Sequence, residues 1–175
     1  NPDPTGEGKP LPIIVVDDGL RRTFVPKLRV VELLEEVPQQ IVTIRIDQPL
    51  ALGGGVVGSV GPSMGITPFD EYGRRIYEMQ TGDGPLSVIQ GITELNHKYA
   101  RLQSLKGSSR KVQWDMSLAT SSIPKDQLKQ ILTKVISREN ADDWLTMVRF
   151  YLQGQHFYEA RSELQALIDR FPDRK

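Results

Sequence analysis

Residues 40–47 alternate along the chain in the way expected of a β-strand with one buried face. Val42, Ile44 and Ile46 share one side of this segment, and we expect that side to be buried. The other side carries Ile41, Thr43, Arg45 and Asp47. The pattern predicts a half-buried strand within an antiparallel sheet.

Other apolar runs of strand length recur through the first two thirds of the chain. We expect strands at residues 13–16, 22–25, 28–34, 72–79, 86–95, 99–105 and 111–119. Asp17, Asp18 and Gly19 join the first two, and we interpret both carboxylates as turn residues rather than metal ligands. Short spacings without intervening helices indicate an antiparallel β domain, built as a sandwich or a curved meander.

Helical spacing of apolar residues begins only after residue 120. Ser121, Ser122 and Pro124 are typical of a helix start, and Leu128 opens an apolar stripe that continues to residue 136. The predicted fold class is therefore α+β. We expect a flexible lead-in at residues 1–10, the β domain at residues 11–120 with a glycine-rich loop from residue 52 to 65, and a three-helix segment at residues 121–175.

Residues 141–174 read as two antiparallel helices. Asn140 is a good N-cap, and Gly154 is expected to end the first helix. The stripe of the first helix is Trp144, Met147, Val148 and Tyr151. The facing stripe of the second helix is Phe157, Ala160, Leu164, Leu167, Ile168 and Phe171, and Pro172 stops that helix.

This hairpin resembles one tetratricopeptide unit. The positions that match the family pattern are Trp144, Tyr151, Phe157, Ala160 and Pro172. The positions that depart from it are Val148, Gly154, which comes one residue early, Leu164 and Leu167. The resemblance implies an array of several repeats, so we expect the chain to be a piece of a larger repeat protein. The alternative is an ordinary helical hairpin.

Charge and composition narrow the classes of partner. The 22 basic residues balance the 22 acidic ones, so there is no overall field to attract nucleic acid. The chain has no cysteine, which excludes disulfides and thiol catalysis. No apolar run approaches the roughly 18 residues that span a bilayer, so we expect no membrane insertion. The Pro- and Gly-rich start favours export to the bacterial periplasm or cell envelope.

Two short motifs suggest catalysis but lack its structural setting. Residues 53–58 fit the G-x-G-x-x-G pattern of dinucleotide sites, yet Gly61 and Pro62 oppose the helix that pattern requires. Ser63 lies in a G-x-S-x-G motif, for which Asp83 and His97 are the candidate partners. We expect no cofactor, no metal and no enzymatic activity, although loop carboxylates such as Asp70, Glu71 and Asp83 are the alternative set for a calcium or magnesium ion.

Three hypotheses for function follow. The first is a non-catalytic interaction or scaffolding module that binds a protein, a peptide or further repeats, or that forms a homodimer through an uncovered apolar helical face. Its candidate surface is Trp144, Tyr151, Gln155, Leu167 and Phe171. The second is a carbohydrate-binding β-sandwich with Trp114, Tyr72 or Tyr77 on a concave face. The third is a hydrolase that uses Ser63.

Overall fold

The computed structural model describes residues 12–33, 40–55, 60–110 and 112–173. It divides the chain into two compact units, Asn1–Gln39 and Gln40–Lys175, which are described separately below. The lead-in expected at residues 1–10 lies outside the described residues. The division falls after Gln39, and the change from strands to helices near Thr120 lies inside the second unit.

In the first unit, strands β1 (Ile13–Asp17) and β2 (Arg22–Pro26) form the predicted antiparallel hairpin. Asp17 accepts from the Gly19 N–H at 2.9 Å and from Arg22 Nε at 2.8 Å. The Arg22 hydrogen bond is the main reason that the pKa of Asp17 lies below its usual value. The interpretation of the two aspartates as turn residues is confirmed, since Asp18 accepts from the backbone of Leu20 and Arg21.

The strand predicted at residues 28–34 is wrong over its described part. A 3₁₀ turn, η1 (Lys27–Arg29), follows β2, and residues 30–33 form no strand. Val30 donates its N–H back to the Lys27 carbonyl at 3.1 Å, which closes the turn instead of extending the chain. Leu28 and Val31 of this apolar run are exposed, so they do not form the buried face that the prediction of a strand assumed.

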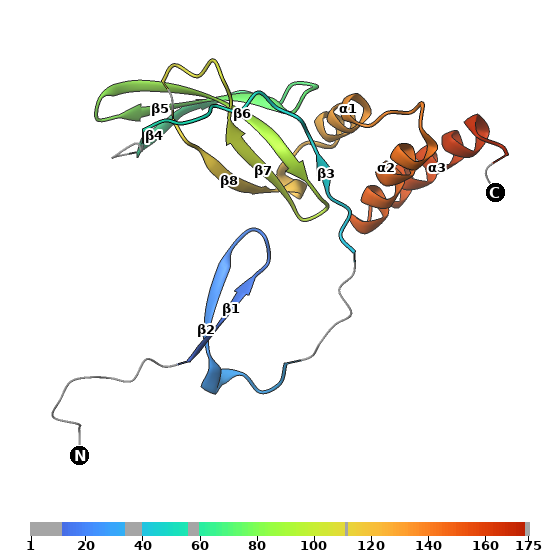
Figure 1. The fold of residues 1–175 in the computed structure, drawn as a ribbon, viewed down its shortest axis with the longest axis horizontal. Coiled ribbons are helices and arrows are strands. Elements are labelled where there is room, and N and C mark those ends of the chain that lie inside the picture. Colours follow the sequence, from blue (N-terminus) through green and yellow to red (C-terminus); the bar gives the residue numbers. More distant parts are fainter. Residues whose placement is uncertain (1–11, 34–39, 56–59, 111, 174–175) are drawn as a thin grey trace. The chain divides into compact units, whose positions relative to one another are not determined.

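The second unit begins with a curled antiparallel sheet (Figure 1). Its strands are β3 (Ile44–Arg45), β4 (Val60–Ile66), β5 (Arg74–Thr81), β6 (Gly84–Leu95), β7 (Tyr99–Ser104) and β8 (Asp115–Ala119). The order of strands across the sheet is β4-β5-β6-β7-β8. Outside this order, β3 also pairs with β6. All of these pairs are antiparallel, which confirms the predicted class of sheet.

The alternation at residues 40–47 is confirmed as a burial pattern. Ile44 and Ile46 are buried, Val42 is half-buried, and the residues between them are exposed. Only Ile44 and Arg45 pair as strand residues, opposite Leu95 and Glu94 of β6. The rest of the segment is not assigned as strand: Ile46 still donates its N–H to the Thr93 carbonyl of β6, whereas Gln40 and Val42 bond the Gln153 side chain of a helix.

The glycine-rich stretch at residues 52–65 is only partly a loop. Its last residues belong to β4, which pairs with β5 through two irregularities in register. Pro62 is tolerated there because β4 is the terminal strand of the sheet, where one row of backbone donors has no partner strand. Glycine and proline concealed this strand from the hydrophobic pattern.

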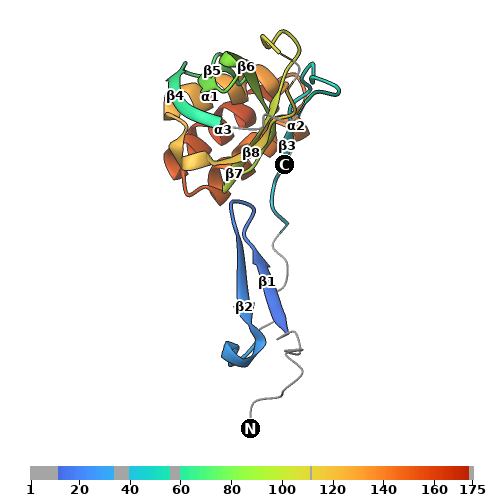
Figure 2. The same cartoon turned by 90° about the vertical axis from the view of Figure 1, so that its left-hand side faces the viewer.

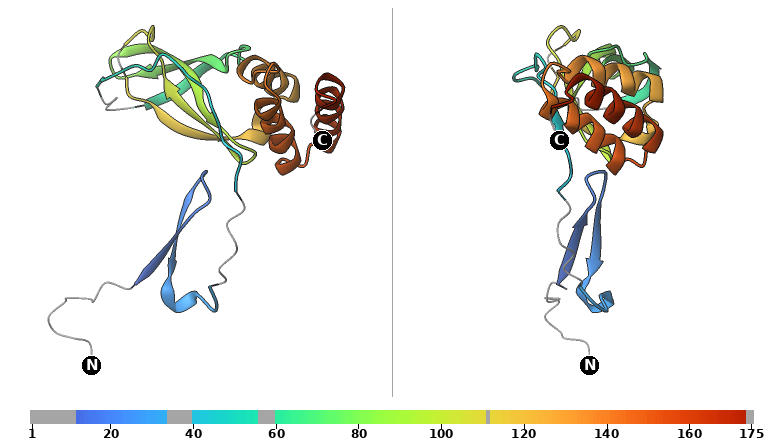
Figure 3. Two further views of the ribbon diagram at one scale, coloured as in Figure 1. Left: turned by 45° about the vertical axis from the view of Figure 1, so that its right-hand side comes forward. Right: turned by 90° about the vertical axis from the view of Figure 1, so that its right-hand side faces the viewer.

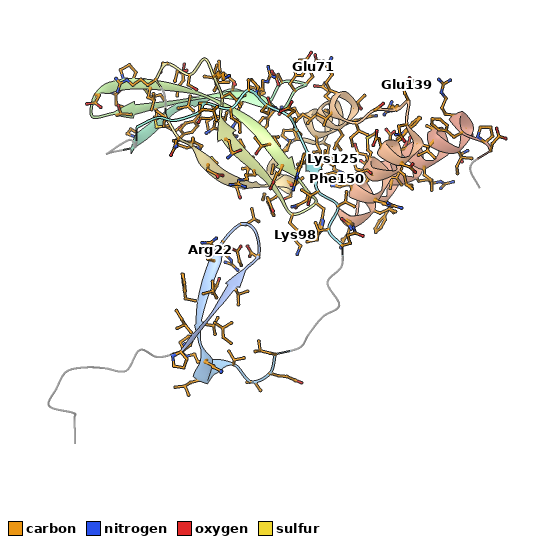
Figure 4. The ribbon with its side chains drawn as sticks, viewed as in Figure 1. Arg22, Glu71, Lys98, Lys125, Glu139 and Phe150 are labelled. Carbon is orange, nitrogen blue, oxygen red and sulfur yellow. The ribbon has the colours of Figure 1, made fainter. Side chains whose placement is uncertain are left out.

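After the short turn η2 (Thr120–Ser122), three helices follow: α1 (Lys125–Val135), α2 (Ala141–Gln153) and α3 (Phe157–Arg170). They lie together beside the sheet, and α3 is the outermost helix (Figure 2, Figure 3). Side chains of the sheet, such as Leu95 and Leu102, share one hydrophobic core with Ile131 of α1 and Phe150 of α2. Phe150, labelled in Figure 4, is almost completely buried.

The turn between α2 and α3 places its left-handed residue one position after the glycine. Gly154 has φ −81°, whereas Gln155 has φ +60°. Gln155 is exposed, and its N–H donates to the Leu152 carbonyl at 3.1 Å. Gln155, a residue with a side chain, therefore adopts the left-handed backbone conformation that glycine usually adopts at the C-terminus of a helix.

We expect Gln155→Gly to raise the free energy of unfolding by about 0.5–1 kcal/mol, because glycine adopts a positive φ without the Cβ clash. Urea denaturation measures the change as a shift in midpoint.

The matched control is Gln130→Gly, at an exposed position inside α1, which is expected to lower stability by about 1 kcal/mol. Equal losses for the two variants would contradict the assignment of the strain to Gln155.

Candidate functional site

The helical hairpin is held at defined positions by its caps. The Asn140 side chain accepts from the Asp142 N–H at 2.9 Å and begins α2. At the other end the Gly154 and His156 N–H groups donate to the carbonyls of Phe150 and Tyr151. These bonds turn the chain tightly, so that α3 returns along α2.

A buried carboxylate joins the helices. Glu163 of α3 is only 8% exposed, and both of its oxygens accept from Arg138, at 2.8 and 2.9 Å. The Trp144 Nε1–H donates to Glu163 Oε2 at 2.8 Å, and the Arg138 guanidinium lies 5.2 Å from the centre of the Trp144 ring. The carboxylate of Glu163 thus connects three parts of the chain: the segment that follows α1, helix α2, and helix α3 itself.

Tyr151 lies in the same part of the core. Its pKa is raised to about 12, mainly because burial disfavours the phenolate and further because Glu163 and Glu159 are negative. Its ring packs edge-on against Phe150 at 5.8 Å. These contacts make Tyr151 a neutral core residue.

Three of the five residues predicted as an interaction surface are buried in the structure. Trp144 is 6% exposed, Tyr151 3% and Leu167 8%, so their side chains fill the interior of the hairpin. Phe171 is half-buried, edge-on to Trp144 at 6.5 Å between ring centres, and only Gln155 is exposed. Apolar spacing identified the residues that hold the helices together, and it could not distinguish them from residues facing outward.

An exposed apolar surface lies on a neighbouring side of α3. Phe157 is 64% exposed, Leu164 38% and Ile168 48%. Spacings of seven and four residues place these three on one side of a helix with 3.6 residues per turn. We call them the α3 stripe. Its members belong to the predicted apolar set of the second helix, but the buried part of that set is Ala160 and Leu167.

The serine motif is not a nucleophile elbow. Ser63 lies within β4 and not at a turn from strand to helix. Asp83 is in the turn before β6 and His97 in the turn after it, at opposite ends of a 12-residue strand. That separation is on the order of 35 Å along the strand, so Asp83 and His97 cannot act on one serine.

Of the glycine motif, Gly53, Gly54 and Gly55 are described and begin no helix, whereas residues 56–58 lie outside the described part. Each of the three loop carboxylates already has protein partners. Asp70 accepts from the Tyr72 and Arg74 N–H groups, Glu71 pairs with Lys134 and Asp83 with Arg110. Among the described residues, no three His, Asp or Glu side chains gather as metal ligands would.

The aromatic residues of the sheet pack on one another. The Tyr77 and Trp114 rings lie 5.4 Å apart and flank a small core of Met79, Leu86, Val88 and Val112. Tyr72 contacts Arg74 and Lys134 through its ring face. Packing accounts for these rings, and carbohydrate binding stays a prediction.

No family model, curated protein or solved structure matches the chain. The resemblance of the hairpin to a tetratricopeptide unit therefore stays a prediction from the residues themselves. Within the described part of the chain, none of the helices has the length and apolar character needed to cross a lipid bilayer.

We expect Glu163→Gln to lower the free energy of unfolding by about 1–3 kcal/mol. The carboxylate receives donors at both oxygens, so the amide NH₂ of glutamine must face either Arg138 or the Trp144 N–H. Urea denaturation measures this loss.

The same substitution at Glu139 is the control. Glu139 pairs with Arg170 at 3.7 Å, and both side chains are largely exposed, so Glu139→Gln should change stability by less than about 0.5 kcal/mol. A similar effect at both positions would contradict a special role for the buried carboxylate.

Proposed function

We propose that Gln40–Lys175 is a non-catalytic protein-interaction module in which the α3 stripe binds an amphipathic helix of a partner protein or of a further repeat. The observation that carries the proposal is the exposure of three large apolar side chains on one side of the outermost helix. Surface apolar residues are common singly, but an aligned set on one helix indicates a docking face.

The shape of the α3 stripe supports a helix as the occupant. Phe157 and Ile168 are eleven residues apart, which is about 16 Å along a helix, or three turns. A partner helix with apolar residues at i, i+3, i+4 and i+7 covers such a stripe along its length. Burying the exposed parts of the three side chains is worth about 1 kcal/mol each, which suits a reversible interaction.

Charge beside the α3 stripe restricts the partner further. Arg161 lies one turn after Phe157, is exposed, and has no ion pair with any residue that the structure describes. A partner helix carrying an acidic residue beside its apolar stripe would pair with this guanidinium.

The predicted resemblance to a tetratricopeptide unit is consistent with this occupant. In such arrays each repeat is a helical pair that cannot cover both of its faces alone, and neighbouring repeats pack on it. A helix of a following repeat would meet α3 in the same way as a helix of a partner.

A photo-crosslinking amino acid placed at Leu164 or Ile168, in the cells that make this protein, tests the proposal. We expect crosslinks from both positions into a helical segment that carries an apolar stripe, identified by mass spectrometry of the joined peptides. The same amino acid at Ser162 or Ala166 is the control, because these positions face another side of α3 and should give no such product.

Two results would contradict the proposal: equal crosslinking from all four positions, or products that join α3 only to the α3 of a second copy. The latter would make the face a homodimer contact.

With the photo-crosslinking amino acid placed at position 157, the double variant Leu164→Ser, Ile168→Ser should reduce the yield of crosslinked product at least tenfold, while the urea midpoint changes little. Tyr158→Ser provides the matched change, since Tyr158 is 83% exposed on the same helix but lies outside the α3 stripe.

A further inference from the structure

A second surface of the same unit has the features of a ligand site. A cavity of about 890 Å³ lies between the extended segment at residues 40–45, the adjacent ends of β6 and β7, and one side of α2. Lys98, in the turn between β6 and β7, marks this end of the sheet in Figure 4. We call this cavity the α2 groove. Its volume is within the range of sites that bind ligands of peptide or drug size.

One wall of the α2 groove is fixed by a side-chain amide. Gln153 Nε2 donates to the Gln40 carbonyl at 2.8 Å, and Gln153 Oε1 accepts from the Val42 N–H at 2.9 Å. The amide thus takes the place of a neighbouring strand and holds the segment extended. A wall fixed in this way does not have to be ordered when a ligand binds.

Two guanidinium groups line the α2 groove without protein partners. Arg45 comes from β3 and Arg149 from α2, both residues are exposed, and neither side chain forms a hydrogen bond or ion pair with any residue that the structure describes. Most other arginines of this unit are used: Arg101 binds Asp115, and Arg138 binds Glu163. Arginines that converge on one cavity suit a carboxylate, which accepts two parallel N–H bonds from each group.

One carboxylate also lines the α2 groove. Glu94 is the partner of Arg45 across the β3–β6 pair, and the two form no ion pair. The pKa of Arg101 is raised mainly by its hydrogen bond to Asp115, and the negative charge of Glu94 raises it further. Two arginines against one glutamate leave the lining with a net positive charge.

The α2 groove also offers apolar contacts. Ile41 is 40% exposed and Leu152 49% exposed, and both line it. We infer that the α2 groove binds a short acidic peptide, whose carboxylates pair with Arg45 and Arg149 and whose apolar side chains cover Ile41 and Leu152. This site is separate from the α3 stripe and does not depend on the function proposed for it.

The test uses the full 175-residue chain and a fluorescein-labelled octapeptide of alternating glutamate and leucine. Fluorescence anisotropy should show saturable binding that weakens as sodium chloride is raised, because partly exposed ion pairs are screened. Arg45→Gln and Arg149→Gln should each weaken binding roughly fivefold or more. Amide NMR signals of residues 40–45 and 146–153 should shift on binding, and those of residues 157–168 should not.

The controls separate the α2 groove from other features. Arg161→Gln removes an exposed arginine from α3, and Leu164→Ser with Ile168→Ser removes two members of the α3 stripe; neither should change binding of the octapeptide. A sister peptide with lysine in place of glutamate should bind much more weakly.

Three results would overturn the inference: no saturable binding of the acidic octapeptide, equal binding of its lysine counterpart, or full affinity in the Arg45→Gln, Arg149→Gln double variant. Displacement of the octapeptide by inorganic phosphate at equal concentration would also overturn it, since a small anion would then suffice.

Discussion

The arrangement of the C-terminal helices depends on one buried carboxylate, that of Glu163. A charge with so little exposure is costly unless its donors are in place, and here Arg138 and the Trp144 N–H supply them. The donors come from two other elements, so the rotation of α3 about its own axis is fixed by where they lie. A rotation that moved Glu163 away would leave both the carboxylate and the indole N–H without partners.

That rotation decides which apolar residues of α3 are covered. With Glu163 inward, Ala160 and Leu167 pack against α2, while the α3 stripe faces solvent on the adjoining side. The stripe is therefore a consequence of the same interaction that stabilises the hairpin. The α2 groove has a comparable origin, because Gln153 holds an extended segment against α2 and leaves Arg45 and Arg149 beside it.

The sequence predicted the features that depend on local periodicity and turn chemistry. The strand alternation around Ile44, the aspartate turn and the helix caps at Asn140 and Gly154 are local, and the structure confirms them. β4 was hidden because glycine and proline are poor strand formers, and only its pairing with β5 makes it a strand.

The candidate site was harder to predict, since helical spacing gives a set of apolar residues on α3 but not the boundary between covered and exposed ones. Trp144 and Tyr151 were expected at a surface and lie in the core. Glu163 reads in sequence as an ordinary exposed charge, yet it occupies the buried side of α3 between Ala160 and Leu167. The one local sign was its spacing, three residues after Ala160 and four before Leu167.

The most direct test of this account uses the absence of cysteine from the chain. Single variants Leu164→Cys, Ile168→Cys and Leu167→Cys are labelled with a thiol reagent under native conditions, and each rate is compared with that of the unfolded protein. If Glu163 sets the rotation of α3, positions 164 and 168 react at nearly the unfolded rate, while position 167 is protected on the order of a hundredfold or more. Protection of 164 and 168 equal to that of 167 would show that the α3 stripe is covered, and would contradict the account.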